Sequence, residues 1–172
     1  PPGLLSPAEI GALVSHLGRR HGVRKVRLTG GDPTFRGDLT EILERIAAVP
    51  EVQDLAMTTN GMLLPSRALD WRRAGLNRVN ISLDSLDPLR FARMTGVPGL
   101  ERVVRGIESA LAAGFERVRL NTVVLRHENL EELPNLLSFA ADLGVEIRFI
   151  ELMPMGPLAT AWKDGYVPAV RM

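Results

Sequence analysis

The sequence predicts an α/β protein built on a parallel sheet. Short apolar stretches of strand length alternate along the chain with longer stretches of helical periodicity, which is the order typical of βαβ units. Glycines or short polar residues follow most of the strand-like stretches. With 172 residues, of which 45% are hydrophobic, the chain has enough apolar surface for one domain with a core.

The first predicted helix begins after Ser6 and ends near Gly22. Ser6 suits the N-cap, Pro7 the first helical position and Glu9 the third position of a capping box. Apolar residues then recur at helical spacing, at Ile10, Leu13, Val14 and Leu17.

A predicted strand, Lys25–Thr29, comes next and ends at a glycine pair. Apolar residues alternate with Arg27 and Thr29 along it, and Gly30-Gly31 follows. A turn without side chains lets backbone groups approach a ligand, although Gly-Gly-Asp-Pro also suits an ordinary turn between a strand and a helix.

The remaining elements continue the alternation. Asp38 and Glu41 repeat the capping-box pattern and predict a second helix from Leu39 to Val49. Further strands are predicted at Leu55–Thr59, Arg78–Asp84, Arg117–Val124 and Glu146–Leu152. Further helices are predicted at Pro65–Ala74, at Pro88–Thr95, from Leu100 to Gly114, and around Leu136–Leu143, where Pro134 fits either the first position or the first turn. The tail from Met155 has no periodicity.

Alternation along the strands predicts which face of the sheet carries function. If the apolar positions face the helices, the opposite face carries Arg27, Thr29, Thr58, Asn60, Asn80, Ser82, Asp84, Arg119 and Asn121. A filled barrel would place branched apolar residues there, so these polar groups need a ligand, water or each other. The last strand carries charges on both faces, which leaves its orientation open. We expect a site at the carboxyl ends of the strands, as in other parallel α/β proteins.

Composition excludes several classes of protein. The net charge is +1 and the basic residues are scattered, so no nucleic-acid partner is expected. Neither a membrane-spanning apolar run nor a signal-peptide pattern occurs, which predicts a cytoplasmic protein. The chain has no cysteine, so disulfides and cysteine-ligated clusters are excluded, and His16, His21 and His127 lack the spacing of a metal site.

Four stretches resemble motifs of radical S-adenosylmethionine enzymes. They are Arg27–Pro33 (Arg-Leu-Thr-Gly-Gly-Asp-Pro, similar to a Gly-Gly-Glu-Pro motif), Thr58–Gly61, Asn80–Asp87 and Arg148–Gly156. Their flanks, order and spacing are similar to the molybdenum cofactor biosynthesis protein A family, the GTP 3',8-cyclases, from Leu4 to about Trp162.

The resemblance implies an incomplete parallel (β/α)6 barrel of the radical S-adenosylmethionine type that lacks its first strand. Residues 1–153 would hold the second to sixth strands, and residues 154–172 would begin a C-terminal extension. The chain would then be part of a longer enzyme.

The resemblance also implies site residues. Gly31, Asp32, Ser82 and Met153 match positions that bind S-adenosylmethionine, and Arg27, Thr58 and Arg119 match positions that bind GTP. The family usually has Glu at the place of Asp32 and Lys at the place of Arg119. Without the resemblance, Gly31 and Asp32 would be read as turn residues, Met153 as core and the arginines as ion-pair partners.

The activity implied is the first step of molybdenum cofactor biosynthesis. The parent enzyme would convert GTP to 3',8-cyclo-7,8-dihydro-GTP with a 5'-deoxyadenosyl radical, formed from S-adenosylmethionine by one of two [4Fe-4S] clusters. None of the residues named would act as a general base. The cluster cysteines are absent from this chain, so alone it should be inactive. Cyclic pyranopterin monophosphate synthase would act next in the pathway, and a homodimer is one expected assembly.

Two alternatives stay open. One is another radical S-adenosylmethionine enzyme, such as a peptide-modifying one. The other is a non-catalytic relative that only binds nucleotide or cofactor.

Overall fold

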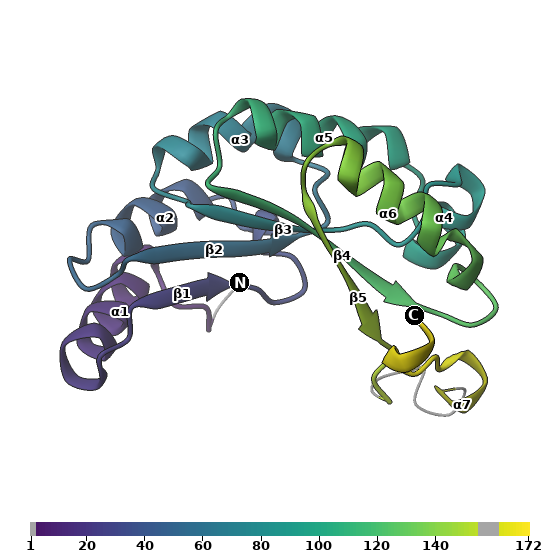
Figure 1. Cartoon of the computed structure of the whole chain (residues 1–172). Helices are drawn as coiled ribbons and strands as arrows, with labels where there is room; N and C mark the ends of the chain where they lie inside the picture. Colours follow the sequence, from purple (N-terminus) through teal and green to yellow (C-terminus); the bar gives the residue numbers. More distant parts are fainter. Residues whose placement is uncertain (1–2, 155–161) are drawn as a thin grey trace.

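A curved parallel sheet forms the frame of the protein. The computed structural model describes residues 3–154 and 162–172. Its five strands lie in the order β1-β2-β3-β4-β5, and all neighbouring pairs are parallel. They are β1 Lys25–Leu28, β2 Asp54–Thr59, β3 Arg78–Ser82, β4 Arg117–Val124 and β5 Glu146–Glu151. Helices α1 to α6, within residues 7–142, lie on the outer, convex side of the sheet, and within the described residues no helix covers the middle of its concave side (Figure 1). The predicted incomplete α/β barrel is therefore confirmed.

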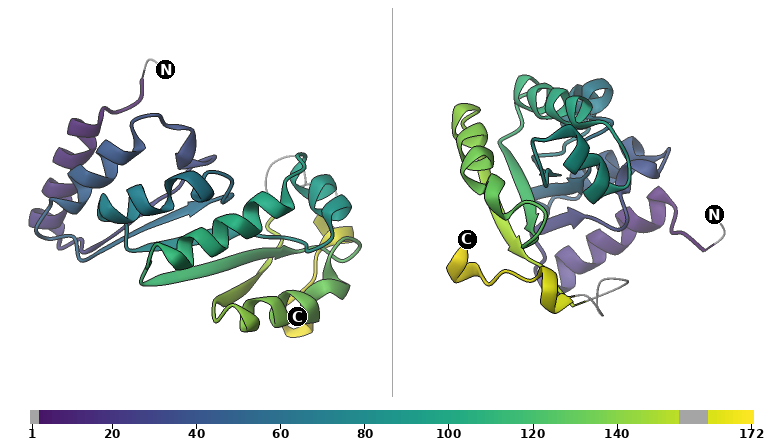
Figure 2. Two further views of the ribbon diagram at one scale, coloured as in Figure 1. Left: turned by 90° about the horizontal axis from the view of Figure 1, so that it is seen from above. Right: turned by 90° about the vertical axis from the view of Figure 1, so that its right-hand side faces the viewer.

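The helices follow the strands in alternation. The α-helices are α1 Pro7–His21, α2 Leu39–Ala47, α3 Leu64–Arg73, α4 Pro88–Thr95, α5 Leu100–Ala112, α6 Leu133–Asp142 and α7 Trp162–Gly165, and short 3-10 turns are η1 Pro33–Phe35, η2 Leu130–Glu132 and η4 Ala169–Arg171. Seen from above, α3 and α5 lie across the middle of the sheet (Figure 2). Pro134 occupies the first turn of α6, which settles the open start of that helix.

The predicted cap of α1 is confirmed in detail. The Ser6 hydroxyl accepts from the Glu9 N–H at 3.3 Å, and the Glu9 carboxylate accepts from the Ser6 N–H at 2.8 Å. Gly22 ends the helix in the left-handed conformation, at φ 68°.

Several predicted element ends differ from the structure by one or two residues, and two wrong predictions have a side-chain cause. Asp38 does not cap α2 with its side chain, because the guanidinium of Arg36 occupies both of its carboxylate oxygens, at 2.7 and 2.8 Å. This contact also lowers the pKa of Asp38. Strand β3 ends at Ser82 rather than at Asp84. There the carboxylate of Asp84, instead of a backbone carbonyl, accepts the N–H of Val123 at 2.8 Å.

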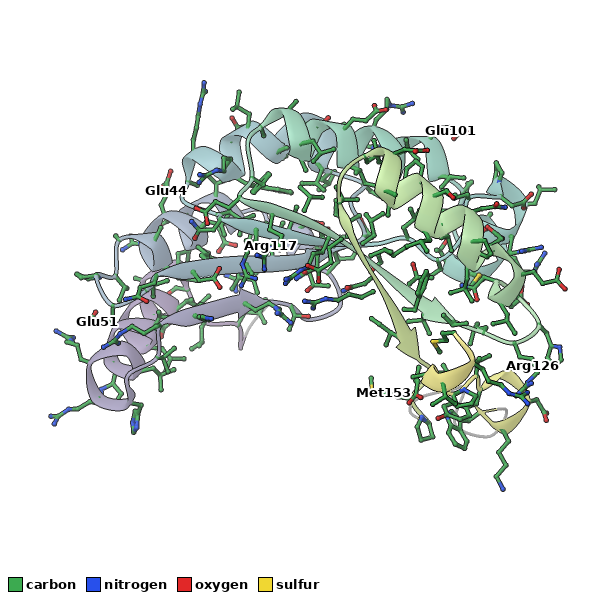
Figure 3. The ribbon with its side chains drawn as sticks, in the orientation of Figure 1. Glu44, Glu51, Glu101, Arg117, Arg126 and Met153 are labelled. Carbon is green, nitrogen blue, oxygen red and sulfur yellow. The ribbon has the colours of Figure 1, made fainter. Side chains whose placement is uncertain are left out.

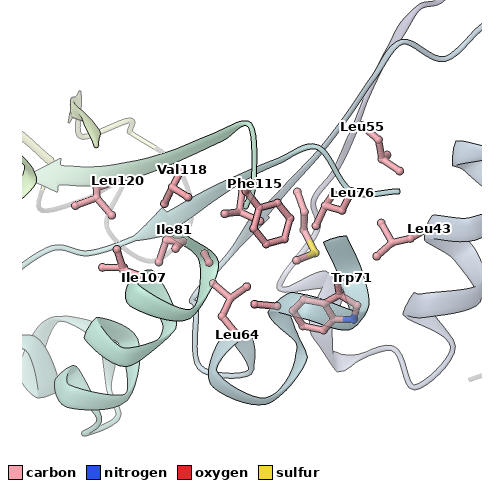
Figure 4. Close-up of a cluster of buried hydrophobic side chains, with 14 of the residues drawn as sticks. Leu43, Leu55, Leu64, Trp71, Leu76, Ile81, Ile107, Phe115, Val118 and Leu120 are labelled. Carbon is pink, nitrogen blue, oxygen red and sulfur yellow. The ribbon is translucent and has the colours of Figure 1, made fainter. Parts of the chain in front are cut away.

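The hydrophobic core lies between the sheet and the helices (Figure 4). Ile81 and Leu120 point outward from the sheet and are fully buried, as is Ile107 of α5. Trp71 of α3 packs in the same core. Burying such side chains contributes roughly 1.5–3 kcal/mol each. The predicted apolar parity of the strands is thus correct, and the concave face carries the polar residues.

The described part of the tail packs beside the end of β5. The Trp162 indole donates to the carbonyl of Leu152 at 2.7 Å, and the Arg126 N–H donates to the carbonyl of Gly165 at 2.9 Å. Val167 is buried there. The proposed domain boundary at residue 153 stays a prediction, and part of the predicted tail, residues 155–161, lies outside the described residues. None of the helices in residues 3–154 and 162–172 combines the length and the hydrophobicity of a membrane-spanning segment.

Candidate active site

The centre of the concave face is a row of polar side chains that runs across four strands. Strand register places Thr58 of β2 beside Asn80 of β3, Asn80 beside Arg119 of β4, and Arg119 beside Glu146 of β5. The Asn80 amide donates to the Thr58 hydroxyl at 3.4 Å. Asn80 and Arg119 are buried, at 3% and 8% exposure. Two predicted GTP residues, Thr58 and Arg119, therefore stand in one row.

Glu146 holds two arginines at one end of this row. Its carboxylate lies 2.8 Å from Nε of Arg119 and accepts from Nε of Arg148 at 3.0 Å. The Arg119 N–H does not point at the carboxylate oxygen, so the first contact is a charge interaction rather than an aligned hydrogen bond. The two guanidinium groups, Arg119 first, lower the pKa of Glu146. The orientation of β5 is thereby settled, with Glu146 and Arg148 both on the concave face.

A second group of charges lies at the amino ends of the strands. Strand register places Arg27 beside Ala56, Ala56 beside Arg78, and Arg78 beside Arg117. Arg117, the first residue of β4, is labelled in Figure 3. A cavity of about 320 Å³ opens there, lined by Lys25, Asp54, Arg78, Glu116 and Arg117.

The cavity is lined by three cations and two carboxylates, so it carries a small positive charge. Arg78 forms an ion pair with Asp54, and Glu116 accepts from the amide of Asn77 at 2.9 Å. Lys25 and Arg117 are exposed. Together with Arg27 they make the amino end of the concave face a place where an anion would be stabilised.

The glycine turn stands at the carboxyl end of β1. Gly30 has φ 148°, a conformation that favours glycine. A side chain at Gly30 or Gly31 would meet no atom within 4 Å, so this turn faces open space. The carboxylate of Asp32 accepts from the backbone N–H of Asn60, at the end of β2, at 2.7 Å. The turn after β1 is thus tied to the end of β2.

Ser82 lies at the carboxyl end of β3. It is exposed and stands beside Asn121 in the register of β3 and β4. Among residues 3–154 and 162–172, the buried side-chain oxygen of Asn121 has no hydrogen-bond partner, so it is available to a ligand. Burial raises the pKa of the neighbouring Asp84. The hydrogen bond from the Val123 N–H lowers it, but this effect is smaller.

Met153 lies apart from the other predicted cofactor residues. It follows β5, at the opposite edge of the sheet from Gly31 and Asp32, and is 59% exposed (Figure 3). It is therefore not a core residue.

An iron–sulfur cluster does not fit the residues of this chain. The sequence has no cysteine, and the described residues contain no group of three or more His, Asp or Glu side chains placed to hold a metal ion. Thiolates are the usual ligands of such clusters, so any cluster would need ligands from outside these 172 residues.

The structure adds concave-face residues that the sequence reasoning did not single out. They are Lys25, Arg78, Arg117, Glu146 and Arg148. Lys25, Arg78 and Arg117 share the parity of predicted residues on their own strands, so alternation could have found them. For Glu146 and Arg148 no such signal existed, because charges occur on both faces of β5.

Comparisons with known proteins point to one superfamily. The Radical SAM superfamily model matches residues 1–140. The fold also resembles the crystal structure of Streptococcus suis SuiB bound to S-adenosylmethionine, with a TM-score of 0.69 at 21% identity, covering 84% of this chain and 33% of SuiB.

Curated relatives are more similar in sequence. The GTP 3',8-cyclase of Rhodopirellula baltica is 44% identical over 162 residues, which are 94% of this chain and 45% of the relative. The GTP 3',8-cyclase 1 of Pseudomonas aeruginosa is 50% identical over 135 residues, or 78% of this chain and 41% of the relative. The chain thus spans less than half the length of these two relatives.

Proposed function

The chain belongs to the radical SAM superfamily, and from this membership we propose that it forms the barrel part of a GTP 3',8-cyclase. The proposed reaction converts GTP to 3',8-cyclo-7,8-dihydro-GTP. The proposal is supported by 44–50% identity to two proteins of that name. It is also supported by the polar concave face, which a structural sheet would have filled with apolar side chains.

The observation that most directly supports GTP binding is the set of cations on the concave face. Arg27 and Arg119, the predicted GTP residues, lie on this face with Lys25, Arg117 and Arg148. GTP carries a triphosphate, and guanidinium groups bind phosphate oxygens through paired, charged hydrogen bonds. We therefore assign the triphosphate to this face, with Thr58 contacting the same nucleotide.

The cofactor is assigned to the carboxyl ends of the strands. Gly31 and Ser82 are exposed there, as expected of residues that contact a bound molecule. Asp32 and Met153 complete the predicted set. S-adenosylmethionine, when bound, would supply the radical that removes hydrogen from the substrate. The part of this chain is to bind both molecules, to orient them and to limit the access of water.

The proposal extends to the cellular context. We propose that the enzyme acts in the cytoplasm as a homodimer and that its product is the substrate of a cyclic pyranopterin monophosphate synthase.

A binding experiment with the full-length protein tests the proposal. GTP should bind more tightly than guanosine, because the triphosphate contacts the concave cations. This preference should weaken as salt rises, since screening acts on exposed charges. Equal affinities for GTP and guanosine would contradict the assignment of the triphosphate to this face.

A further inference from the structure

Glu146 is the counter-ion of two arginines on the concave face. Its Oε2 lies 2.8 Å from Nε of Arg119, and its Oε1 accepts from Nε of Arg148 at 3.0 Å. In the part of the chain that the structure describes, no other carboxylate forms an ion pair with either guanidinium group. One carboxylate therefore serves two cations, and this end of the polar row keeps a positive charge.

The contact with Glu146 leaves Arg119 incompletely satisfied. The arginine side chain is only 10% exposed, and the described residues offer its buried Nε–H no aligned acceptor. A buried donor without an aligned acceptor costs free energy. An anion placed in line with this N–H would therefore bind Arg119 better than Glu146 does.

Glu146 is able to give way to such an anion. It is the first residue of β5, and its side chain is 43% exposed, so the carboxylate can turn into water at little cost. The two guanidinium groups, Arg119 first, lower its pKa, so the carboxylate is ionised at neutral pH. It therefore competes, as an anion, for the same cations as a phosphate group.

We propose that Glu146 is a specificity-determining residue, whose carboxylate occupies the phosphate position at Arg119 and Arg148 and yields it to the polyphosphate of GTP but not to a single phosphate. The inference depends on the proposed function, because it concerns the same triphosphate site. A single phosphate would only exchange one anion for another at the two arginines. The polyphosphate gains in addition from cations at the amino ends of the strands, such as Lys25 and Arg117.

Competition by inorganic phosphate tests the proposal, by equilibrium binding of GTP to the full-length protein with its clusters at constant ionic strength. Phosphate at about 10 mM should leave the Kd for GTP of the unmodified protein unchanged. Glu146→Gln removes the internal anion, so phosphate should bind at Arg119 with a Kd of about 1 mM, and about 10 mM phosphate should raise the apparent Kd for GTP about tenfold. Equal competition in both proteins would overturn the inference.

Glu101→Gln is the matched control. Glu101 is exposed in α5, on the convex side of the sheet (Figure 3), so its replacement changes the net charge by the same amount and leaves the partner of Arg119 in place. Phosphate should compete with GTP no better in this variant than in the unmodified protein. Competition that appears in both variants would indicate a general effect of charge and would contradict the role of Glu146.

A structure of the full-length protein with GTP supplies a second readout that needs no variant. A phosphate oxygen should lie in line with the Nε–H of Arg119, and the 2.8 Å contact with Glu146 should be lost. A complex in which Glu146 keeps this contact would overturn the inference and leave the proposed function standing. If the unmodified protein did not bind GTP, the proposed function would fail and the inference with it.

Discussion

Arg119 and Glu146 face each other on neighbouring strands, with Nε of the arginine 2.8 Å from a carboxylate oxygen. The Arg119 side chain is only 10% exposed, whereas that of Glu146 is 43% exposed. A guanidinium buried to this degree needs a counter-charge. Glu146 supplies it in the absence of an anion, and the pair marks where we expect a phosphate group to compete.

Replacing Arg119 should weaken GTP binding. Each charged hydrogen bond to phosphate contributes roughly 1.5–3 kcal/mol, so Arg119→Ala in the full-length protein should raise the Kd for GTP by about ten- to a hundredfold. Arg119→Lys should recover much of the loss, because the positive charge is kept. Calorimetric titration with GTP measures both.

Glu146→Gln is the control for the Arg119 variants. It removes the ion-pair partner of Arg119 but keeps the arginine, so GTP affinity should be preserved or increased. If Arg119→Ala lowered the melting temperature but left GTP affinity as in the unmodified protein, the role of Arg119 would be structural and the residue would not belong to the GTP site.

Ser82→Leu should weaken S-adenosylmethionine more than GTP. Ser82 is exposed at the carboxyl end of β3, where the larger side chain would occupy the proposed cofactor position. Calorimetry with each ligand on the full-length protein distinguishes the two effects. Equal losses for both ligands would point to general misfolding and would remove Ser82 from the cofactor site.

Asp84→Asn should stabilise the protein near neutral pH. Burial raises the pKa of Asp84 in the folded state, so the protonated form is favoured there. Its contribution to stability is therefore fully present below the ordinary pKa of about 3.9 and is lost as the pH rises through the raised value. The asparagine keeps the oxygen that accepts from Val123.

Urea unfolding across pH measures this difference. The variant should be more stable than the unmodified chain at about pH 7 and equally stable at about pH 3, below both pKa values. A variant that is less stable at neutral pH would show that the charged carboxylate has a stabilising partner in the fold.

This chain alone should not assemble an iron–sulfur cluster, because it has no cysteine. Anaerobic reconstitution followed by iron and sulfide analysis tests this. A stoichiometric amount of bound cluster would refute the prediction.

Much of the fold could be predicted because period-2 and helical patterns are local. Strand β4 and helix α4 have the predicted bounds, since apolar alternation and an Asp-Pro start define them. The end of β3 could not be predicted, because it depends on a side chain, Asp84, that replaces a backbone acceptor across the sheet. The predicted side-chain cap of α2 was wrong for a similar reason, because the guanidinium of Arg36 binds the carboxylate of Asp38.

The site was predictable to the level of strand parity. Alternation along each strand placed Thr58, Asn80 and Arg119 on one face of the sheet. Their alignment in one row depends on the register between strands, which alternation within a strand does not determine. Asp32 accepts from Thr34, two residues away, and also from Thr59 and Asn60, 27 and 28 residues away. The contacts to Thr59 and Asn60 follow from no local pattern.

The most direct test follows the hydrogen that is removed from the substrate. The full-length protein with its clusters is incubated anaerobically with a reductant, S-adenosylmethionine and GTP that carries deuterium at C3'. A GTP 3',8-cyclase should form 5'-deoxyadenosine that contains deuterium and should consume GTP in parallel. Formation of 5'-deoxyadenosine without deuterium, while GTP stays intact, would contradict a cyclase that acts on GTP.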